Sequence, residues 1–201
     1  MTATTAPASG TAAATAATLA TPDGPFTALV RDGAVLASGW TDEIADLVAL
    51  VHPTLRPAVV ETVPTTAGRV ADVVAAVTAY YEGDLDAPAR VPVHQASGEF
   101  RMHAWDALRA VAPGEAITYT QYAARAGRPL AVRAAAGACA MNAAALFVPC
   151  HRIVRTDGSL GGFRYGLPIK RSLLDREARG AGAVAERSPE QVLAATSSAS
   201  R

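Results

Sequence analysis

Residues 149–154 read Pro-Cys-His-Arg-Ile-Val, and both the fold and the chemistry assigned to this chain depend on that string. It follows a short apolar run, Ala-Ala-Leu-Phe-Val, at residues 144–148. A cysteine thiol becomes a nucleophile when a base or a positive charge lies close to it, and His151 could supply either for Cys150. Adjacent side chains on an extended strand point to opposite sides, so this pair needs a turn or a bridging water. The pair by itself leaves open a buried, inert cysteine beside a hydrogen-bonded histidine.

An acid that orients the imidazole would complete a relay of the triad type. Glu177 is the best candidate, at the end of an apparent helix over residues 170–177. The chain has two cysteines, Cys139 and Cys150, which are too few for a disulfide framework and lack the C-x-x-C spacing of zinc sites. We therefore expect a reducing compartment, a free thiol and no metal site.

Two short helices precede the string. Thr118 is expected to cap a helix over residues 119–126, a turn follows at 127–129, and a second helix runs over 130–141. Another helix, over residues 98–111, comes before them and ends at Pro113-Gly114. This order matches a helix-turn-helix, although any pair of antiparallel helices gives the same outline.

The second helix of that pair has an unusual composition. It carries one long cation, Arg133, among alanines and a glycine. Small side chains let a helix backbone approach closely, as the narrow minor groove of DNA requires. Packing against another helix favours alanine too, so composition alone leaves both interpretations open.

The first half of the chain carries no catalytic motif. An Asp32-Gly33 pair between two apolar runs predicts a hairpin over residues 26–40, and helices are expected over 42–51, capped by Thr41, and over 69–81. His52 and His94 stand beside prolines and are expected on the surface. The predicted fold is α+β, with a small α/β domain at 23–95, a mainly helical domain at 96–177, and disordered, Ala-rich tails at 1–22 and 178–201.

Charge separates the two halves. The net charge of the 201 residues is zero, but residues 23–100 carry 4 arginines and 11 acids, a net charge of −7. Residues 101–177 carry 10 arginines, 1 lysine and 5 acids, a net charge of +6. This asymmetry indicates that the second half meets a polyanion, although solvated faces alone can produce it.

The residues after the string complete a longer pattern: Asp157-Gly158, then Gly161-Gly162-Phe163, then Lys170-x-x-Leu-Leu-x-x-Glu177. Over about residues 100–177 the chain resembles the O6-alkylguanine-DNA alkyltransferases, also called methylated-DNA–protein-cysteine methyltransferases. It is most similar to the C-terminal domain of the bacterial adaptive-response protein.

The resemblance implies a role for each matching residue. Cys150 would accept the alkyl group, and His151 would draw off its proton through a water, with Glu177 behind it. Tyr119 would help to rotate the damaged nucleotide out of the helix and would donate a proton to the leaving guanine. Asn142 would join the recognition helix to the active-site turn, and Arg152 would hold that turn through a buried charge pair.

Further positions match the DNA contacts and the guanine pocket. Arg133 would occupy the gap left in the base stack, with Ala134 and Gly137 facing the DNA. The pocket would be formed by Val148, Pro149, Gly161, Gly162, Phe163 and Arg164. Phe163 stands where the family commonly has Tyr, which removes a possible hydrogen bond to the base but keeps the ring. Ala143 stands where Pro is common.

The implied activity is direct-reversal DNA repair, an irreversible, single-turnover transfer of an alkyl group from O6-alkylguanine to Cys150, with O4-alkylthymine as a second candidate substrate. We expect a monomeric protein whose partner is double-stranded DNA and which needs no cofactor or metal. We also expect it to be soluble and cytoplasmic and to have no membrane segment, because no apolar run approaches about 20 residues and the N-terminus does not resemble a signal peptide. Three alternatives remain: a non-catalytic binder that flags alkylated DNA, a helix-turn-helix regulator with an incidental Cys-His pair, and a thiol hydrolase. Binders of the first kind lack the acceptor cysteine, and nothing marks the oxyanion site that a hydrolase needs.

Overall fold

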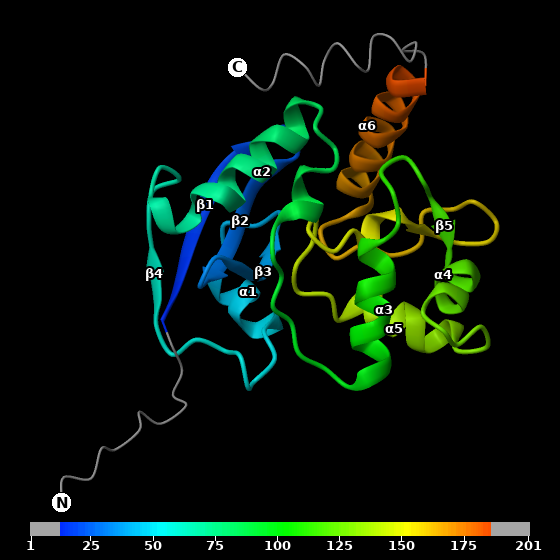
Figure 1. Cartoon of the computed structure of the whole chain (residues 1–201), viewed down its shortest axis with the longest axis horizontal. Helices are drawn as coiled ribbons and strands as arrows, with labels where there is room; N and C mark the ends of the chain where they lie inside the picture. Colours follow the sequence, from blue (N-terminus) through cyan, green and yellow to red (C-terminus); the bar gives the residue numbers. More distant parts are fainter. Residues whose placement is uncertain (1–12, 186–201) are drawn as a thin grey trace, which may run out of the picture.

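A computed structural model describes residues 13–185 and contains a four-stranded sheet beside a group of helices (Figure 1). The strands are β1 (Ala14–Thr21), β2 (Gly24–Arg31), β3 (Ala34–Gly39) and β4 (Val60–Thr62), in the spatial order β3-β2-β1-β4. β2 runs antiparallel to both β1 and β3, whereas β4 is parallel to β1.

Strand β1 overturns the prediction of disorder for residues 1–22. From Ala14 onward this segment is an inner strand, and Ala16 and Ala17 are buried. The segment lacks large apolar residues, which is why its composition suggested disorder. Small side chains nevertheless suit a strand enclosed on both faces, and threonine favours the β conformation. The part of the prediction that covers residues 1–12 lies outside the described residues.

The hairpin predicted at Asp32-Gly33 is confirmed. These residues join β2 to β3 with φ angles of +52° and +74°, as a tight turn between twisted strands requires. The next helix, α1 (Ile44–Leu50), begins later than predicted. Thr41 does not cap it, because its hydroxyl accepts a hydrogen bond from Glu43 N, one residue before the helix.

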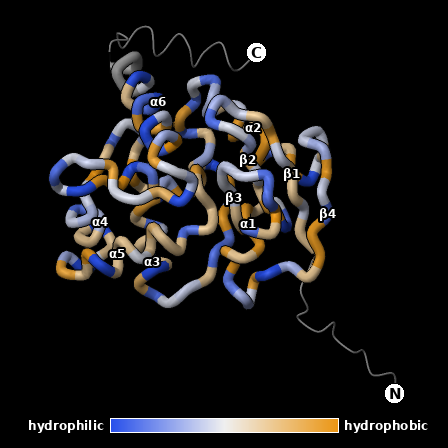
Figure 2. The backbone as a smooth tube through the Cα atoms, turned by 180° about the vertical axis from the view of Figure 1, so that it is seen from behind, coloured by the Kyte–Doolittle hydropathy of each residue, from blue (hydrophilic) through white to orange (hydrophobic). Residues whose placement is uncertain are grey.

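The sheet buries both of its faces. Phe26, Ala28 and Val30 of β2 face a large core that includes α2 (Ala71–Glu82), which is preceded by the 3₁₀ turn η1 (Gly68–Val70). Leu29 points the opposite way, into a smaller core with α1. The alternation follows from the two-residue period of a strand. Figure 2 shows the hydrophobic stretches along these strands.

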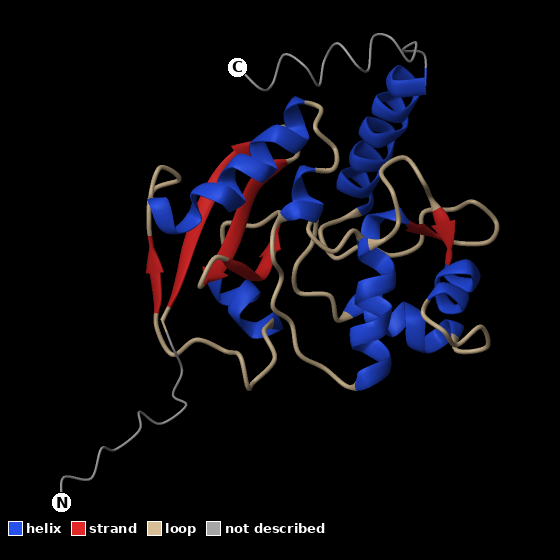
Figure 3. Ribbon diagram, viewed as in Figure 1, coloured by secondary structure: helices blue, strands red, loops and turns tan. Residues whose placement is uncertain are grey.

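The second half is mainly helical, as predicted (Figure 3). After the 3₁₀ turn η2 (Ala87–Arg90) come α3 (Glu99–Arg109), β5 (Ile117–Thr118), α4 (Tyr119–Arg125), α5 (Val132–Ala140), the 3₁₀ turn η3 (Cys150–Arg152), β6 (Ile153–Val154) and α6 (Leu167–Ala185). Thr118 caps α4, and its hydroxyl and the Gln121 side chain form a reciprocal capping box.

Helix α6 overturns part of the second predicted tail. Residues 178–185 continue the helix rather than starting a disordered segment at 178. Glu177 is fixed in the core, and the alanines that follow it have high helix propensity, so the helix continues past its buried anchor. Residues 186–201 lie outside the described part of the chain.

One large hydrophobic core joins the two halves. It contains Val77 and Tyr80 of α2 together with Trp105 and Leu108 of α3 and Leu173 of α6. The sheet region and the helical region therefore pack through shared side chains, and the predicted α+β class is confirmed. Among residues 13–185 no helix combines the length and the apolar character that crossing a membrane demands.

Candidate active site

A short parallel pairing brings the two motif-bearing segments together. Ile117 pairs with Ile153 and Thr118 with Val154, so the strand that leads into α4 lies beside the strand that follows η3. Tyr119 follows the first of these strands, and Cys150 lies in the 3₁₀ turn that leads into the second. This turn supplies the change of direction that the adjacent Cys150 and His151 require.

A cavity of about 450 Å³ opens at Cys150. Six residues predicted from the sequence line it: Tyr119, Asn142, Cys150, Gly162, Phe163 and Arg164. Cys139, Ala136 and Ala140 of α5 complete the wall, and sequence reasoning had not assigned them to the pocket. Three predicted pocket residues do not line this cavity: Val148 and Pro149, which are buried, and Gly161, which is half-buried.

The Cys150 thiol is half-buried, and burial raises its pKa above the ordinary value. The Asn142 amide and the Lys170 ammonium act in the opposite direction, because both stabilise the thiolate. Burial also raises the pKa of Cys139, and a thiolate at Cys150 would raise it further. Of the two thiols, Cys150 is the one that has a neighbouring histidine in the chain.

Behind Cys150, His151 and Glu177 form a buried pair. His151 Nε2 lies 2.8 Å from Glu177 Oε1, and both side chains are fully enclosed. Burial lowers the pKa of His151 despite the attraction of Glu177, so the imidazole is neutral at pH 7. A neutral imidazole that donates from Nε2 carries its lone pair on Nδ1, and Nδ1 has no partner among the described residues.

Glu177 also forms a buried ion pair with Arg152. Arg152 Nε donates to Glu177 Oε2 and Arg152 Nη2 donates to Oε1, each over 2.9 Å. Tyr80 Oη (3.2 Å) and Gly114 N (3.3 Å) donate to the same carboxylate. Burial alone would raise the pKa of Glu177, but His151 and Arg152 hold it well below its usual range. Glu177 is therefore an anion that fixes the ring of His151.

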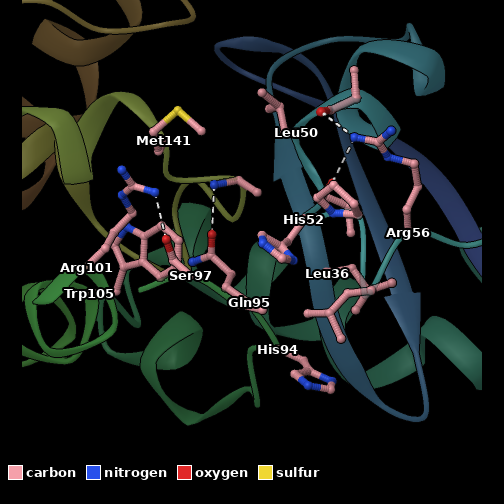
Figure 4. A pocket seen from close by; sticks show the side chains of 16 residues that line it. Leu36, Leu50, His52, Arg56, His94, Gln95, Ser97, Arg101, Trp105 and Met141 are labelled. Carbon is pink, nitrogen blue, oxygen red and sulfur yellow. Dashed lines mark hydrogen bonds between the residues drawn. The ribbon is translucent and has the colours of Figure 1, made fainter. Parts of the chain in front are cut away.

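Asn142 ties the end of α5 to the turn before Cys150. Its Nδ2 donates to Val148 O over 2.8 Å, and its Oδ1 accepts from Ala144 N over 3.1 Å. Gln95 braces the same turn, since its Oε1 accepts from Ala143 N over 2.9 Å (Figure 4). Its Nε2 also donates to Asn142 Oδ1 over 3.2 Å. Sequence reasoning missed Gln95, which carries no local signal.

Tyr119 is half-buried at the cavity wall and lies against Gly161. A β-carbon on Gly161 would come within 3.2 Å of the Tyr119 ring and hydroxyl, and Gly161 has a φ of +66°. Burial raises the pKa of Tyr119, so the phenol keeps its proton at pH 7. It is therefore able to act as a proton donor in the cavity.

Lys170 holds the loop that closes the cavity. Its ammonium is buried and donates to the carbonyls of Ile153 (2.6 Å), Leu160 and Gly162 (3.4 Å). Burial lowers the pKa of Lys170. The sequence pattern contained this lysine but gave it no role. Its position fixes the glycine-rich segment beside Phe163.

The exposed surface of α5 adjoins the cavity. Arg133 and Ala134 are exposed and Gly137 is half-buried, so the predicted contact residues share one accessible side of the helix. Met141 is 53% exposed just after the end of α5. Among the predicted contact residues, Arg133 is the one with a long, charged side chain.

A second cavity, of about 170 Å³, lies between the end of α1, residues 94–97 and the start of α3 (Figure 4). His52, His94, Arg101 and Met141 are among its lining residues. The two histidines are exposed, as expected. None of the residues predicted for catalysis lines this cavity, so the cavity at Cys150 is the candidate active site.

Known proteins support the resemblance found in the sequence. Residues 99–179 match the family model described as 6-O-methylguanine DNA methyltransferase, DNA binding domain. The chain is 46% identical over 93 residues to the bifunctional transcriptional activator/DNA repair enzyme Ada of Escherichia coli, covering 46% of this chain and 26% of that protein. It is 39% identical over 98 residues to the methylated-DNA–protein-cysteine methyltransferase of Haemophilus influenzae, covering 49% of this chain and 55% of that one.

The similarity in structure extends further along the chain. The crystal structure of Mycobacterium tuberculosis OGT in complex with DNA superposes with a TM-score of 0.69 and 26% identity, covering 83% of this chain and 94% of that one. The chain spans only about a quarter to a half of the two curated relatives. The family resemblance is confirmed for the segment that carries the Cys150 cavity.

Proposed function

We propose that this protein repairs DNA by transferring an alkyl group from the O6 atom of guanine to the Cys150 thiol. The observation that carries the proposal is one cavity lined by both Cys150 and Tyr119, with the next residue in the chain, His151, held by the buried Glu177 carboxylate. The names of the relatives, which describe methylated DNA and protein cysteine, support the same reaction.

The thiolate is the nucleophile, and burial raises the pKa of Cys150, so the resting thiol must lose its proton before it attacks. His151 Nδ1 is the available base, and a bridging water would carry the proton to it. Glu177 accepts the Nε2 hydrogen and so keeps the lone pair on Nδ1. The Asn142 amide and the Lys170 ammonium stabilise the thiolate that forms.

The transfer step is a displacement at carbon. The Cys150 sulfur forms a bond to the alkyl carbon while the bond from that carbon to guanine O6 breaks. Tyr119 gives its proton to the departing guanine and later regains one from solvent. The products are an unmodified guanine and a thioether at Cys150, which has no easy route back to a thiol. Each protein therefore acts once, without a cofactor.

DNA would approach the accessible side of α5. The target atom lies inside the duplex, so the base must leave the stack at a cost of a few kcal/mol, less for a mispaired lesion. Ala134 and Gly137 allow a close approach of the helix backbone, and Arg133 would fill the vacated space. The net charge of +6 in residues 101–177 favours the same partner.

Titration of the protein with duplex DNA that carries a radioactive O6-methyl group tests this function. The label on the protein should reach one methyl per chain and then stop, even with DNA in excess. Cys150→Ser should take up no label while it still binds the duplex. Tight binding without label on the unsubstituted protein would instead identify a non-catalytic binder of alkylated DNA.

A further inference from the structure

The end of strand β3 holds the segment that leads to Cys150. Ser38 N donates to Ala143 O over 2.8 Å, Ala145 N donates to Ser38 O over 3.1 Å, and Ser38 Oγ donates to Ala145 O over 2.8 Å. Ser38 is fully buried. The sheet, which carries no catalytic group, thus fixes the chain between Asn142 and Cys150.

The same end of β3 also contacts Tyr165, which follows Phe163 of the cavity wall by two residues. Tyr165 Oη donates to Ser38 O over 3.1 Å. The ring of Tyr165 lies directly on the backbone of Gly39, because a β-carbon there would come within 1.9 Å of Tyr165 Cζ. Only glycine leaves room for this contact.

Trp40 packs against both Tyr165 and Phe163, and Phe163 lines the cavity. Its ring centroid lies 5.9 Å from that of Phe163 and 5.6 Å from that of Tyr165, and Phe163 and Tyr165 are 5.7 Å apart. Phe163 lines the cavity at Cys150, whereas Trp40 does not. The indole therefore stands behind Phe163, on the side away from the thiol.

The orientation of Trp40 is itself fixed. Its Nε1 donates to Tyr81 Oη over 2.9 Å, and Tyr81 Oη donates to Asp23 Oδ2 over 2.9 Å. Phe26 packs edge-on against the indole at 5.1 Å. The indole is 7% exposed, so it forms a rigid support within the sheet region.

We propose that Trp40 is a positioning residue that holds Phe163 at the wall of the cavity and so limits the size of the alkyl group that Cys150 accepts. The inference rests on the proposed function. Phe163 has no hydroxyl with which to anchor itself, so its position depends on ring packing against Trp40 and Tyr165. Removing the indole opens space behind Phe163, and the wall can then retreat from Cys150.

The experiment compares two free bases, O6-methylguanine and O6-benzylguanine, with the full chain. Single-turnover rate constants are measured from the mass gain of the protein. In Trp40→Leu the benzyl-to-methyl ratio of rate constants should rise about tenfold, because the wider cavity admits the larger group and holds the smaller one less well. Trp40→Phe, which keeps a ring, should restore most of the original ratio.

A second variant reaches the same wall without changing Trp40. Gly39→Ala places a methyl group on the Tyr165 ring, so it should displace Tyr165 and raise the ratio in the same direction. Leu29→Ala is the matched control, because it removes buried volume from the same sheet but belongs to the separate core with α1. Its ratio should stay within about twofold of the original.

The outcomes separate the two proposals. If the unsubstituted protein takes up an alkyl group neither from the free bases nor from methylated duplex DNA, the proposed function fails and the role of Trp40 fails with it. If it transfers both, but Trp40→Leu and Gly39→Ala change the two rate constants equally, as Leu29→Ala does, then Trp40 is merely structural and this inference alone is wrong.

Discussion

Replacing Glu177 by glutamine tests the buried network with little change in side-chain shape. The carboxylate receives hydrogen bonds from His151, from two nitrogens of Arg152, from Tyr80 and from Gly114. A glutamine side chain keeps one oxygen that can accept these hydrogen bonds. Its amide NH₂ group replaces the second oxygen and faces groups that also donate. The Arg152 guanidinium, of which 7% is exposed, then loses its counter-charge.

Breaking a buried pair by removing one partner costs about 3–5 kcal/mol, because the other charge stays buried. For a chain of this size that corresponds to a fall of roughly 10 °C in Tm. Because the pKa of Glu177 is held below its unfolded value, this stabilisation is present above about pH 4. The difference from the unsubstituted protein should therefore be complete at pH 7 and should shrink as the pH falls below 4.

Thermal and urea unfolding at pH 7 measure the effect. Glu115→Gln is the matched control, because the Glu115–Arg125 pair is about 40% exposed on each side and should contribute less than about 1 kcal/mol. The reasoning is refuted if Glu177→Gln and Glu115→Gln lower the free energy of unfolding by the same amount.

Three further predictions concern the reaction. Arg133→Ala should slow transfer from duplex DNA at least about tenfold more than transfer from a free base, whereas the control Arg171→Ala should affect both substrates equally. Equal losses on both substrates in Arg133→Ala would show that Arg133 has no role in base flipping. Tyr119→Phe should lower the single-turnover rate constant about a hundredfold with little change in duplex Kd, as expected for a proton donor; an unchanged rate constant would exclude that role. The rate with a free base should rise between pH 6 and 9, because burial raises the pKa of Cys150 while His151 stays neutral; a flat profile would show that thiol ionisation does not limit the rate.

The parts of the site that lie close together in sequence could be predicted. Cys150, His151 and Arg152 form one short string, and the longer sequence pattern connected them to Glu177, which lies within α6. Their geometry agrees with that expectation, because one carboxylate contacts both His151 and Arg152.

Residues that reach the site from distant segments could not be predicted. Tyr80 contacts Glu177 across 97 positions of sequence, and Gln95 contacts Asn142 across 47. Trp40 supports the pocket wall only because the sheet packs against it. Such contacts depend on the folded topology and leave no periodic or local pattern in the sequence.

Strand β1 shows a different limit. Its core-facing residues are mainly alanine, and hydrophobic periodicity is a weak signal when the buried side chains are small. The hairpin turn at Asp32-Gly33 was predictable because its positive φ angles demand particular residues. The sequence therefore predicts a turn that requires particular residues more readily than it predicts a buried strand of small side chains.

Mass spectrometry of peptides after incubation with a duplex that carries one O6-methylguanine tests the central claim most directly. Cys139 and Cys150 line the same cavity, and no arginine or lysine lies between them, so cleavage after Phe147 rather than trypsin alone is used to place the two thiols on different peptides. We predict a gain of one methyl group on the peptide that contains Cys150 and an unchanged Cys139 peptide. An unmodified Cys150 in protein that binds the duplex, or a methyl group on Cys139 instead, would contradict the account.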